Sequence, residues 1–268
     1  MNKSILKKLP TLLAILVMAG GVQTFTSCSS DDEGGGDPSS SSVGGGGGVS
    51  SSSGGGQGGG TSSGGGSIQP SSSSSSLAHI GKGNDISNYR TVVIGTQTWM
   101  AENLDYVVEG SKCYGNNPAN CEKYGSLYNW STAMGFASSC NESSCSSQIQ
   151  SKHRGICPSG WHIPSEAEWD ILMDYVGGSS TAGTKLKATS GWNENGNGTD
   201  EYGFSALPGG YGSSSGGFDI VGSYGYWWSA TEDLAYGAYN RYMGYCNDDV
   251  YRDYINKSSL YSVRCVQD

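Results

Sequence analysis

The sequence predicts a single α+β domain in the carboxyl-terminal two thirds of the chain, and three observations indicate it. All seven Trp and all seventeen Tyr lie from Tyr89 onward, so the residues that can build an aromatic core are confined to residues 89–268. One segment of this region has the apolar spacing of an amphipathic helix, whereas the two ends of the region have the alternation of β-strands. Gly, Asn, Tyr and Ser fill much of the remainder, which predicts long loops around a small sheet. A region of this length is large enough to bury a core.

The beginning of the chain has the pattern of a bacterial lipoprotein signal peptide. Three lysines among the first eight residues precede an apolar run at 9–22, which has the length of a signal h-region rather than of a membrane span. The run leads to Phe-Thr-Ser-Cys at 25–28, which resembles the lipoprotein box, where a cysteine after small residues receives diacylglycerol and becomes the new amino terminus. We therefore expect residues 1–27 to be removed and Cys28 to be lipidated. The alternative is a free Cys28 thiol after ordinary signal cleavage.

The composition of residues 28–88 predicts an acylated amino terminus followed by a disordered tether. The acidic tract at 29–33 resembles the signal that directs some lipoproteins of the Bacteroidetes and related phyla to the cell surface. From there the chain is nearly all Gly and Ser, with too few apolar groups to offset the entropy of ordering, and such a coil spans on the order of 40 Å. We expect an exported outer-membrane lipoprotein that meets the membrane through its lipid and presents the domain at the cell surface. A plain spacer without a partner fits this composition equally well.

The charge of the chain restricts its partners. The formal net charge of −9 becomes −12 once the signal peptide and its three lysines are removed. Nucleic-acid-binding proteins need clusters of Lys and Arg, which are missing here, so we expect no nucleic-acid partner. An acidic surface is compatible with neutral ligands such as glycans. The sequence leaves the oligomeric state open.

Seven of the eight cysteines lie in the domain, and an exported chain reaches a compartment where disulfides form and persist. Sequence alone leaves their pairing open, but two short loops and one long loop are the economical choices. The corresponding pairs are Cys113 with Cys121, Cys140 with Cys145, and Cys157 with Cys265. Cys246 is then left over, either as a buried inert thiol or as a reactive or intermolecular one. No C-x-x-C pair and no paired histidines occur, which argues against a structural zinc site.

The first predicted elements are a hairpin and a short helix. Alternating Val92 and Ile94, a Gly-Thr turn and Thr98-Trp99-Met100 predict a β-hairpin near the start of the domain. The segment 126–134 predicts a helix that buries Leu127, Trp130 and Met134.

The strongest helix signal covers residues 166–176, where four apolar residues recur on one face. They are Trp169, Leu172, Met173 and Val176. Ser165 and Glu168 form a capping box at its start, and Gly177-Gly178 predicts its end.

The last predicted element is a closing strand at 261–266, in which side chains alternate between two faces. We expect it to pair with the first hairpin, because the two ends of a compact domain commonly lie close together.

Five ordered segments of the domain carry a family resemblance. They are IGTQTWMAENL at 94–104, CPSGWHIP at 157–164, GFSALPGG at 203–210, WWSATE at 227–232 and SVRCV at 262–266. Together they resemble the Fibrobacter succinogenes major paralogous domain over nearly all of residues 89–268. That family looks distantly similar to formylglycine-generating enzymes and C-type lectin-like domains, through PSEAEW at 164–169 and the closing VRC. The resemblance implies a C-type lectin-like α+β domain with two helices, a small antiparallel sheet and long loops, and it agrees with a bridge from Cys157 to Cys265.

We expect no enzymatic activity. The formylglycine-generating family uses a pair of cysteines that bind copper late in its chain, and only Cys246 lies in the comparable region here, since Cys265 is better explained by a disulfide. A copper-dependent oxidoreductase of that type is the alternative. Glu166 and Glu168 could be offered as the two acids of a glycosidase, but the capping box and the positive end of the helix explain them better.

We also expect no cofactor and no metal centre, with calcium as the alternative at one loop. Residues 193–198, Asn-Glu-Asn-Gly-Asn-Gly, imitate the opening of an EF-hand loop, but the twelfth position is Phe204 rather than the bidentate Glu. A plain Asn/Gly turn therefore accounts for the loop. The calcium motifs of sugar-binding lectins are missing as well, although Trp192-Asn193-Glu194 comes near one of them.

Aromatic residues crowd the second half of the domain among polar loops. Such rings stack on the apolar faces of sugars or anchor protein interfaces, although Trp227 and Trp228 are better explained as core residues of the sheet. The candidate ligand-binding residues are Trp192, Tyr211, Asp248, Asp249 and Tyr251. We expect a surface-anchored, non-catalytic binding or adhesion module for polysaccharide or another cell-envelope polymer. A structural surface protein with no small ligand is the remaining alternative.

Overall fold

The structure is a computed structural model of the chain, and it describes residues 79–268, which fall in one compact unit. The predicted signal peptide (1–27), the predicted lipidation site Cys28 and most of the predicted tether lie outside the described residues. The last ten residues assigned to the tether, 79–88, contact the domain, because His79 bonds to the Asp105 carboxylate at 2.7 Å. Among the described residues, no helix is both long and apolar enough to cross a membrane.

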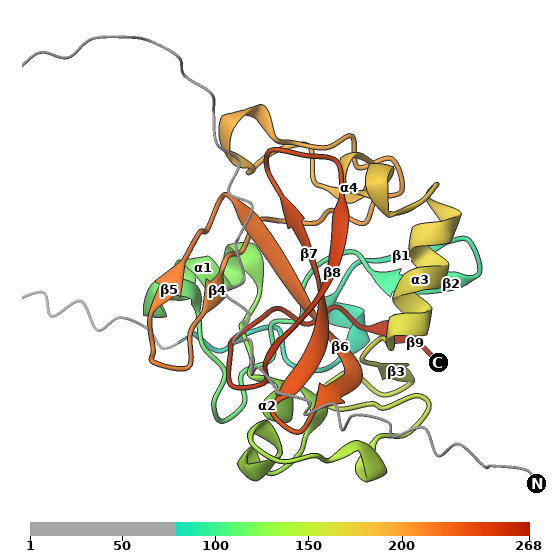
Figure 1. Ribbon diagram of the computed structural model, residues 1–268. Helices are drawn as coiled ribbons and strands as arrows, with labels where there is room; N and C mark the ends of the chain where they lie inside the picture. Colours follow the sequence, from blue (N-terminus) through green and yellow to red (C-terminus); the bar gives the residue numbers. More distant parts are fainter. Residues whose placement is uncertain (1–78) are drawn as a thin grey trace, which may run out of the picture. The chain divides into compact units, whose positions relative to one another are not determined.

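The two ends of the domain meet in one four-stranded sheet, as predicted (Figure 1). Its order is β1-β2-β9-β3, and the strands are β1 (Thr91–Ile94), β2 (Gln97–Met100), β9 (Val266–Gln267) and β3 (Trp161–His162). β1 and β2 form the expected hairpin. Trp99 of β2 pairs with Val266, and the Met100 N–H donates to the Cys265 carbonyl at 3.0 Å. The closing strand is shorter than expected, because residues 261 and 262 form isolated bridges to other segments.

The strongest predicted helix is confirmed as α3 (Glu166–Tyr175), with Val176 as its carboxyl-terminal cap. The capping box is present in both directions, since the Glu168 N–H donates to the Ser165 hydroxyl and the Ser165 N–H donates to the Glu168 carboxylate. The other predicted helix is shorter than expected. α2 covers Trp130–Met134 because the Asn129 side chain caps it there, accepting from the Thr132 N–H.

The prediction of two helices was wrong in number, because the described residues contain four α-helices. The two additional ones are α1 (Pro118–Tyr124) and α4 (Ser179–Leu186). α1 has a recognisable start, with Asn117 as the cap and a proline in the first turn. α4 has no side-chain cap and is rich in Ser, Thr and Gly, so local propensity gave little indication of it.

A second, three-stranded antiparallel sheet divides the interior into two cores. It consists of β6 (Tyr224–Leu234), β7 (Gly237–Gly244) and β8 (Val250–Asn256), in that order. Trp227 and Trp228 are neighbours on β6, so their side chains point to opposite faces. Both are completely buried, Trp227 in the core with α3 and Trp228 in the core with α2. A short hairpin, β4 (Tyr211–Gly212) with β5 (Phe218–Asp219), lies before this sheet in the chain.

All three economical cysteine pairs are confirmed as disulfides: Cys113–Cys121, Cys140–Cys145 and Cys157–Cys265. The expectation of a leftover thiol at Cys246 was wrong. Within the described part of the chain no cysteine is free, and Cys246 is disulfide-bonded.

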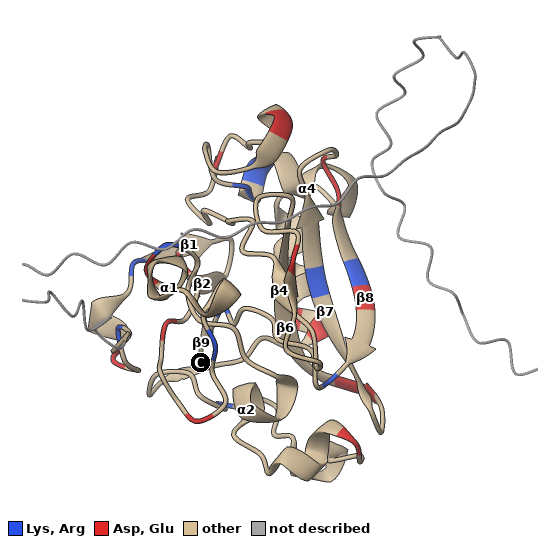
Figure 2. Cartoon of the chain, turned by 90° about the vertical axis from the view of Figure 1, so that its left-hand side faces the viewer, with Lys and Arg blue, Asp and Glu red and all other residues tan. Residues whose placement is uncertain are grey.

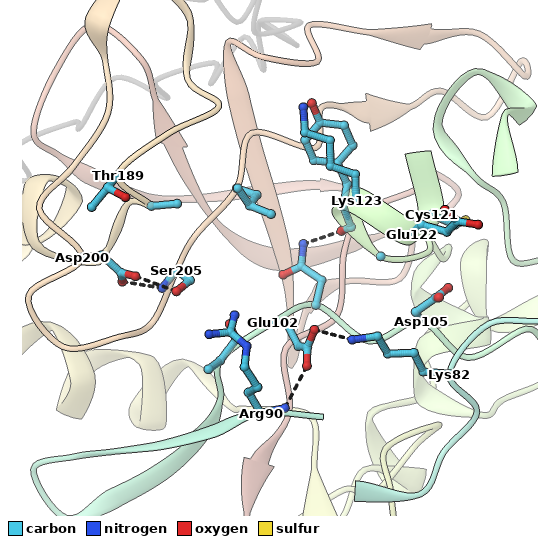
Figure 3. A pocket seen from close by; sticks show the side chains of 16 residues that line it. Lys82, Arg90, Glu102, Asp105, Cys121, Glu122, Lys123, Thr189, Asp200 and Ser205 are labelled. Carbon is cyan, nitrogen blue, oxygen red and sulfur yellow. Dashed lines mark hydrogen bonds and ion pairs between the residues drawn. The ribbon is translucent and has the colours of Figure 1, made fainter. Parts of the chain in front are cut away.

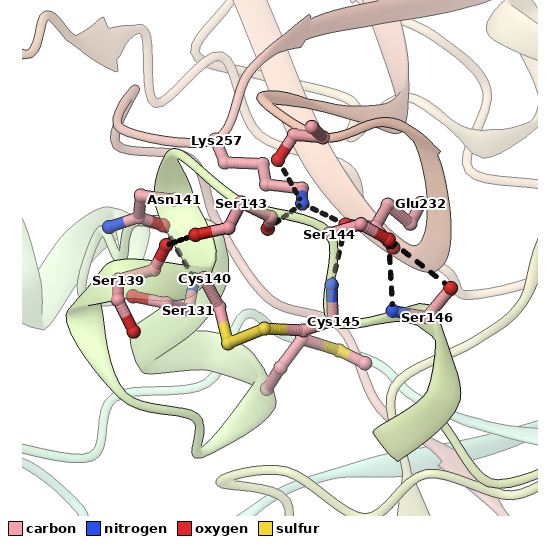
Figure 4. The surroundings of a disulfide bond; sticks show 12 residues. Ser131, Ser139, Cys140, Asn141, Ser143, Ser144, Cys145, Ser146, Glu232 and Lys257 are labelled. Atoms are coloured by element: carbon pink, nitrogen blue, oxygen red, sulfur yellow. Dashed lines mark hydrogen bonds and ion pairs between the residues drawn. A yellow bond between two sulfur atoms is a disulfide. The ribbon is translucent and has the colours of Figure 1, made fainter.

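The small Cys140–Cys145 loop is held to the sheet by a buried ion pair (Figure 4). The Lys257 ammonium, which is fully buried, pairs with the Glu232 carboxylate. That carboxylate also accepts the backbone N–H of Cys145 at 3.0 Å and the hydroxyl of Ser144 at 2.9 Å. The Glu232 carboxylate therefore ties the disulfide loop to the end of β6.

Candidate functional site

One face of the β6–β7–β8 sheet carries a row of tyrosines that reaches from the core to the solvent. Tyr226, Tyr242 and Tyr251 lie directly opposite one another on the three strands. Side chains in such a row share one face of the sheet. Tyr261, from the loop before β9, packs on the inner end of the row. We call the exposed part of this face, formed by Tyr224, Tyr242, Tyr251 and Asp253, the tyrosine surface.

The rings of the row form a continuous stack. Centroid distances are 4.8 Å from Tyr261 to Tyr226, 5.4 Å from Tyr226 to Tyr242 and 4.8 Å from Tyr242 to Tyr251. The outermost pair is nearly parallel, with an interplanar angle of 16°. Each ring restricts the next, so the outer rings are held in place before any ligand arrives.

Exposure increases along the stack from the core outward. Tyr226 is only 6% exposed, Tyr242 is half-buried and Tyr251 is 37% exposed. The Tyr251 hydroxyl donates to the Asp249 carboxylate at 3.2 Å, which further fixes the outermost ring. The result is an aromatic face that is rigid and open to solvent at its outer end.

Asp253 places a carboxylate beside these rings. It lies two residues after Tyr251 on β8, on the same face of the sheet, and is half-buried. Burial raises the pKa of Asp253. Burial, together with the nearby charge of Asp253, raises the pKa of Tyr242 to about 12. The tyrosines of the surface therefore stay neutral at physiological pH.

The structure brings some of the predicted ligand-binding residues together and separates others. Tyr251 and Asp249 lie at the tyrosine surface, and Tyr211 packs edge-on against Tyr226 beneath it. Asp248 instead binds the carboxyl-terminal half of α4, where its side chain accepts from the Thr184 hydroxyl and its backbone carbonyl accepts from the Gly183 N–H.

Trp192 does not face solvent. It is 5% exposed, and its indole N–H donates to the Ala206 carbonyl at 3.0 Å within the core of α3 and α4. Its ring is thus not presented for stacking on a ligand.

Sequence reasoning did not select Tyr242, Tyr224 or Asp253. The alternation of Tyr251 and Asp253 was visible in the sequence, but pairing with β7 was needed to place Tyr242 beside them.

The Asn/Gly loop uses its side-chain oxygens for its own backbone. The Asn197 side chain accepts from the Trp192 N–H at 3.0 Å. Asp200 accepts from both the N–H and the hydroxyl of Ser205, each at 2.6 Å. These contacts agree with a structural turn, and calcium binding at the loop stays an untested alternative.

A separate polar cavity of about 300 Å³ lies between the segment after β2, α1 and the loop after α4 (Figure 3). Glu102 at its centre accepts from the Lys82 ammonium at 2.5 Å and from the Arg90 N–H at 2.8 Å. Burial opposes ionisation of Glu102, but these contacts hold its pKa below the usual value. Asp200, on the opposite wall, is bound to Ser205 as described above. Both carboxylates are therefore engaged by donors of the chain itself.

Among residues 79–268, one group of side chains has the proximity of a metal site: His79, Cys113 and Cys121. The two sulfur atoms are joined in a disulfide, so they offer no thiolate to an ion.

The family model for the Fibrobacter succinogenes major domain matches residues 92–267. The chain belongs to this family. The Fibrobacter succinogenes major domain thus includes both sheets, all three disulfides among the described residues and the whole tyrosine surface. No curated protein and no solved structure matches the chain. The similarity to C-type lectin-like domains therefore stays a prediction.

Proposed function

We propose that this protein is a non-catalytic binding module, held at the cell surface by a lipid anchor, and that its tyrosine surface binds polysaccharide. The observation that carries the proposal is the stack of rings that ends in the exposed face of Tyr251 beside half-buried Tyr242. A sugar ring presents an apolar C–H face that can cover such rings and bury apolar area. Carboxylates at the edge of the surface can accept hydrogen bonds from sugar hydroxyls.

Pre-ordering of the rings supports binding of an extended polymer. Tyr offers a large contact area and loses little conformational entropy when it is already fixed. Here stacking on Tyr242 and the hydrogen bond to Asp249 fix Tyr251 in the absence of a ligand. The open end of the surface lies at the edge strand β8, where a long chain can enter and leave.

The test is a pull-down of the full mature chain, in mild detergent, with a panel of insoluble polysaccharides. Tyr251→Ala should weaken binding by about tenfold or more, because a ring contact and its buried area are lost. Tyr254→Ala is the matched control, since Tyr254 lies on the same strand, is 44% exposed and points to the opposite face. Equal effects of the two substitutions, or no binding to any polymer, would contradict the proposal.

The proposed anchor is tested separately in cells. The proposed lipid would occupy the sulfur of Cys28, so the proposal requires that Cys28 is not the disulfide partner of Cys246. The Cys28→Ala chain should then appear in the soluble periplasmic fraction or the medium, while the unchanged protein stays with the membrane. Retention of the Cys28→Ala chain in the membrane fraction would show that something other than this lipid holds it.

A further inference from the structure

Within residues 79–268, the charged side chain of β7 and β8 that shares the face of the tyrosine surface is acidic. Asp249 and Asp253 lie at the surface, and within the described residues neither of them takes part in an ion pair. Among the described residues, the hydrogen bond to the Asp253 carboxylate comes from the adjacent Tyr254 N–H, at 2.8 Å. Asp249 accepts from the Tyr251 hydroxyl and meets no cation.

The basic residues of the sheet point to the other face. Arg241 and Arg252 lie opposite each other on β7 and β8, one position away from the Tyr242–Tyr251 pair. Figure 2 shows the basic positions of these two strands as blue bands. Because side chains alternate along a strand, both arginines project to the side covered by α3. There Arg241 pairs with Glu166 at 2.8 Å and with Asp170 at 2.6 Å. In the described part of the chain, neither arginine of the sheet therefore contributes a positive charge to the tyrosine surface.

A half-buried carboxylate without a cation partner is costly, since burial removes water that would otherwise solvate its charge. The electron-rich faces of aromatic rings also attract cations. The unpaired carboxylate and the ring faces both favour a cation at this surface. A positively charged ligand is therefore stabilised by both.

We propose that the tyrosine surface selects polysaccharides that carry free amino groups over neutral ones. The ammonium group of an amino sugar lies beside the Asp253 carboxylate, and the sugar ring covers Tyr242 and Tyr251. This inference rests on the proposed function and names the class of glycan that the same surface takes.

The test compares two oligosaccharides that have the same backbone and differ only in charge. Hexamers of glucosamine and of N-acetylglucosamine are titrated into the full mature chain in mild detergent, at a pH where the amines are charged. The glucosamine hexamer should bind about tenfold more tightly, the size expected of one desolvated contact between an ammonium and this surface.

The variants separate a local contact from general attraction to an acidic protein. Asp253→Asn keeps the shape of the side chain and should remove the preference, by lowering the affinity for the glucosamine hexamer about tenfold. An unchanged urea-unfolding midpoint shows that the variant is folded. Asp174→Asn is the control, because it removes one charge from exposed Asp174 on α3, across the sheet, and should keep the preference. Tyr251→Ala should weaken both hexamers.

The remaining outcomes distinguish failure of this inference from failure of the proposed function. Equal affinity for the two hexamers, or a preference that survives in Asp253→Asn, overturns the inference but leaves the proposed binding of polysaccharide standing. Failure of both hexamers to bind overturns the inference, and the proposed function is then judged by the pull-down alone.

Discussion

Arg264 is a buried cation, and none of its hydrogen-bond partners within residues 79–268 is a carboxylate. Its guanidinium donates to the Asn103 side-chain oxygen at 2.7 Å and to the carbonyls of Met100 and Phe204. The same Asn103 oxygen accepts the Trp227 indole N–H at 2.8 Å. Burial lowers the pKa of Arg264 to about 9. Asn103 thus joins the first hairpin, the central sheet and the closing segment through one amide group.

His162 is a second buried polar residue, and it makes the stability of the fold dependent on pH. Its two ring nitrogens lie 2.7 Å from the carboxylates of Glu168 and Asp268. Burial alone lowers the pKa of His162, but the two carboxylates outweigh burial and raise the pKa above its ordinary value of 6.5. Both nitrogens therefore act as donors, which requires the protonated ring.

The free energy of unfolding should consequently fall as pH rises above 6.5, the ordinary pKa of histidine, and through the raised pKa of folded His162. The stabilisation is fully present below the pKa of the unfolded chain and is lost as pH passes the raised pKa of folded His162. Urea unfolding of the protein and of His162→Gln at a series of pH values measures it, because the difference between the two isolates this residue. A difference that does not change with pH would contradict the interpretation. Glu168 has the opposite effect on the pH dependence. Because its pKa is lowered in the folded protein, its contribution to stability is lost as the pH falls into the acidic range.

The candidate site shows which of its residues could be predicted from residue type alone and which could not. Tyr251 and Asp249 were selected because they lie in an aromatic, acidic stretch, and both lie at the tyrosine surface. Trp192 belonged to a similar stretch but is buried, since residue type does not distinguish a ring in the core from a ring at a surface. Tyr242 and Asp253 depended on strand register, which the sequence of one strand does not contain.

At the level of elements, prediction succeeded where local signals agreed. α3 has an apolar stripe, a capping box and a Gly-Gly end, and it was located to within one residue. The first hairpin has alternation and a turn, and it is present as predicted. α4 has none of these signals, and tertiary contacts determine it instead. The Gly183 N–H of α4 donates to the Asp248 carbonyl at 2.7 Å, a contact between segments 65 residues apart.

The capping box of α3 provides a prediction at this scale. Ser165→Ala removes the hydroxyl that accepts from the Glu168 N–H, and it should lower the free energy of unfolding by about 1 kcal/mol. Ser179→Ala is the control, because Ser179 opens α4 without any side-chain cap and its loss should be close to neutral. Denaturant melts of both variants measure the effect. Equal losses would mean that the capping box adds nothing beyond the ordinary cost of the substitution.

At the scale of the whole molecule, the long Cys157–Cys265 disulfide should stabilise the fold more than the short Cys140–Cys145 disulfide. The Cys157–Cys265 bridge spans 108 residues, whereas Cys140–Cys145 spans five. By loop entropy, the long bridge stabilises by about 4–5 kcal/mol and the short one by about 2 kcal/mol. Replacing both cysteines of each pair by Ala and comparing the unfolding free energies tests this order. A larger loss for the short pair would mean that its contacts with Glu232 outweigh chain entropy.

The position of the long bridge has a mechanical consequence. Among the bridges that join two described cysteines, none encloses residues 79–112, and β2 is joined to β9 at a single residue pair. The segment closed by Cys157 and Cys265, in contrast, contains the tyrosine surface. A force applied at residue 79 while a ligand holds this surface would separate the first hairpin from the rest of its sheet early. The covalent link between Cys157 and Cys265 would then carry the load, so the hairpin can unfold before the ligand-binding surface is deformed.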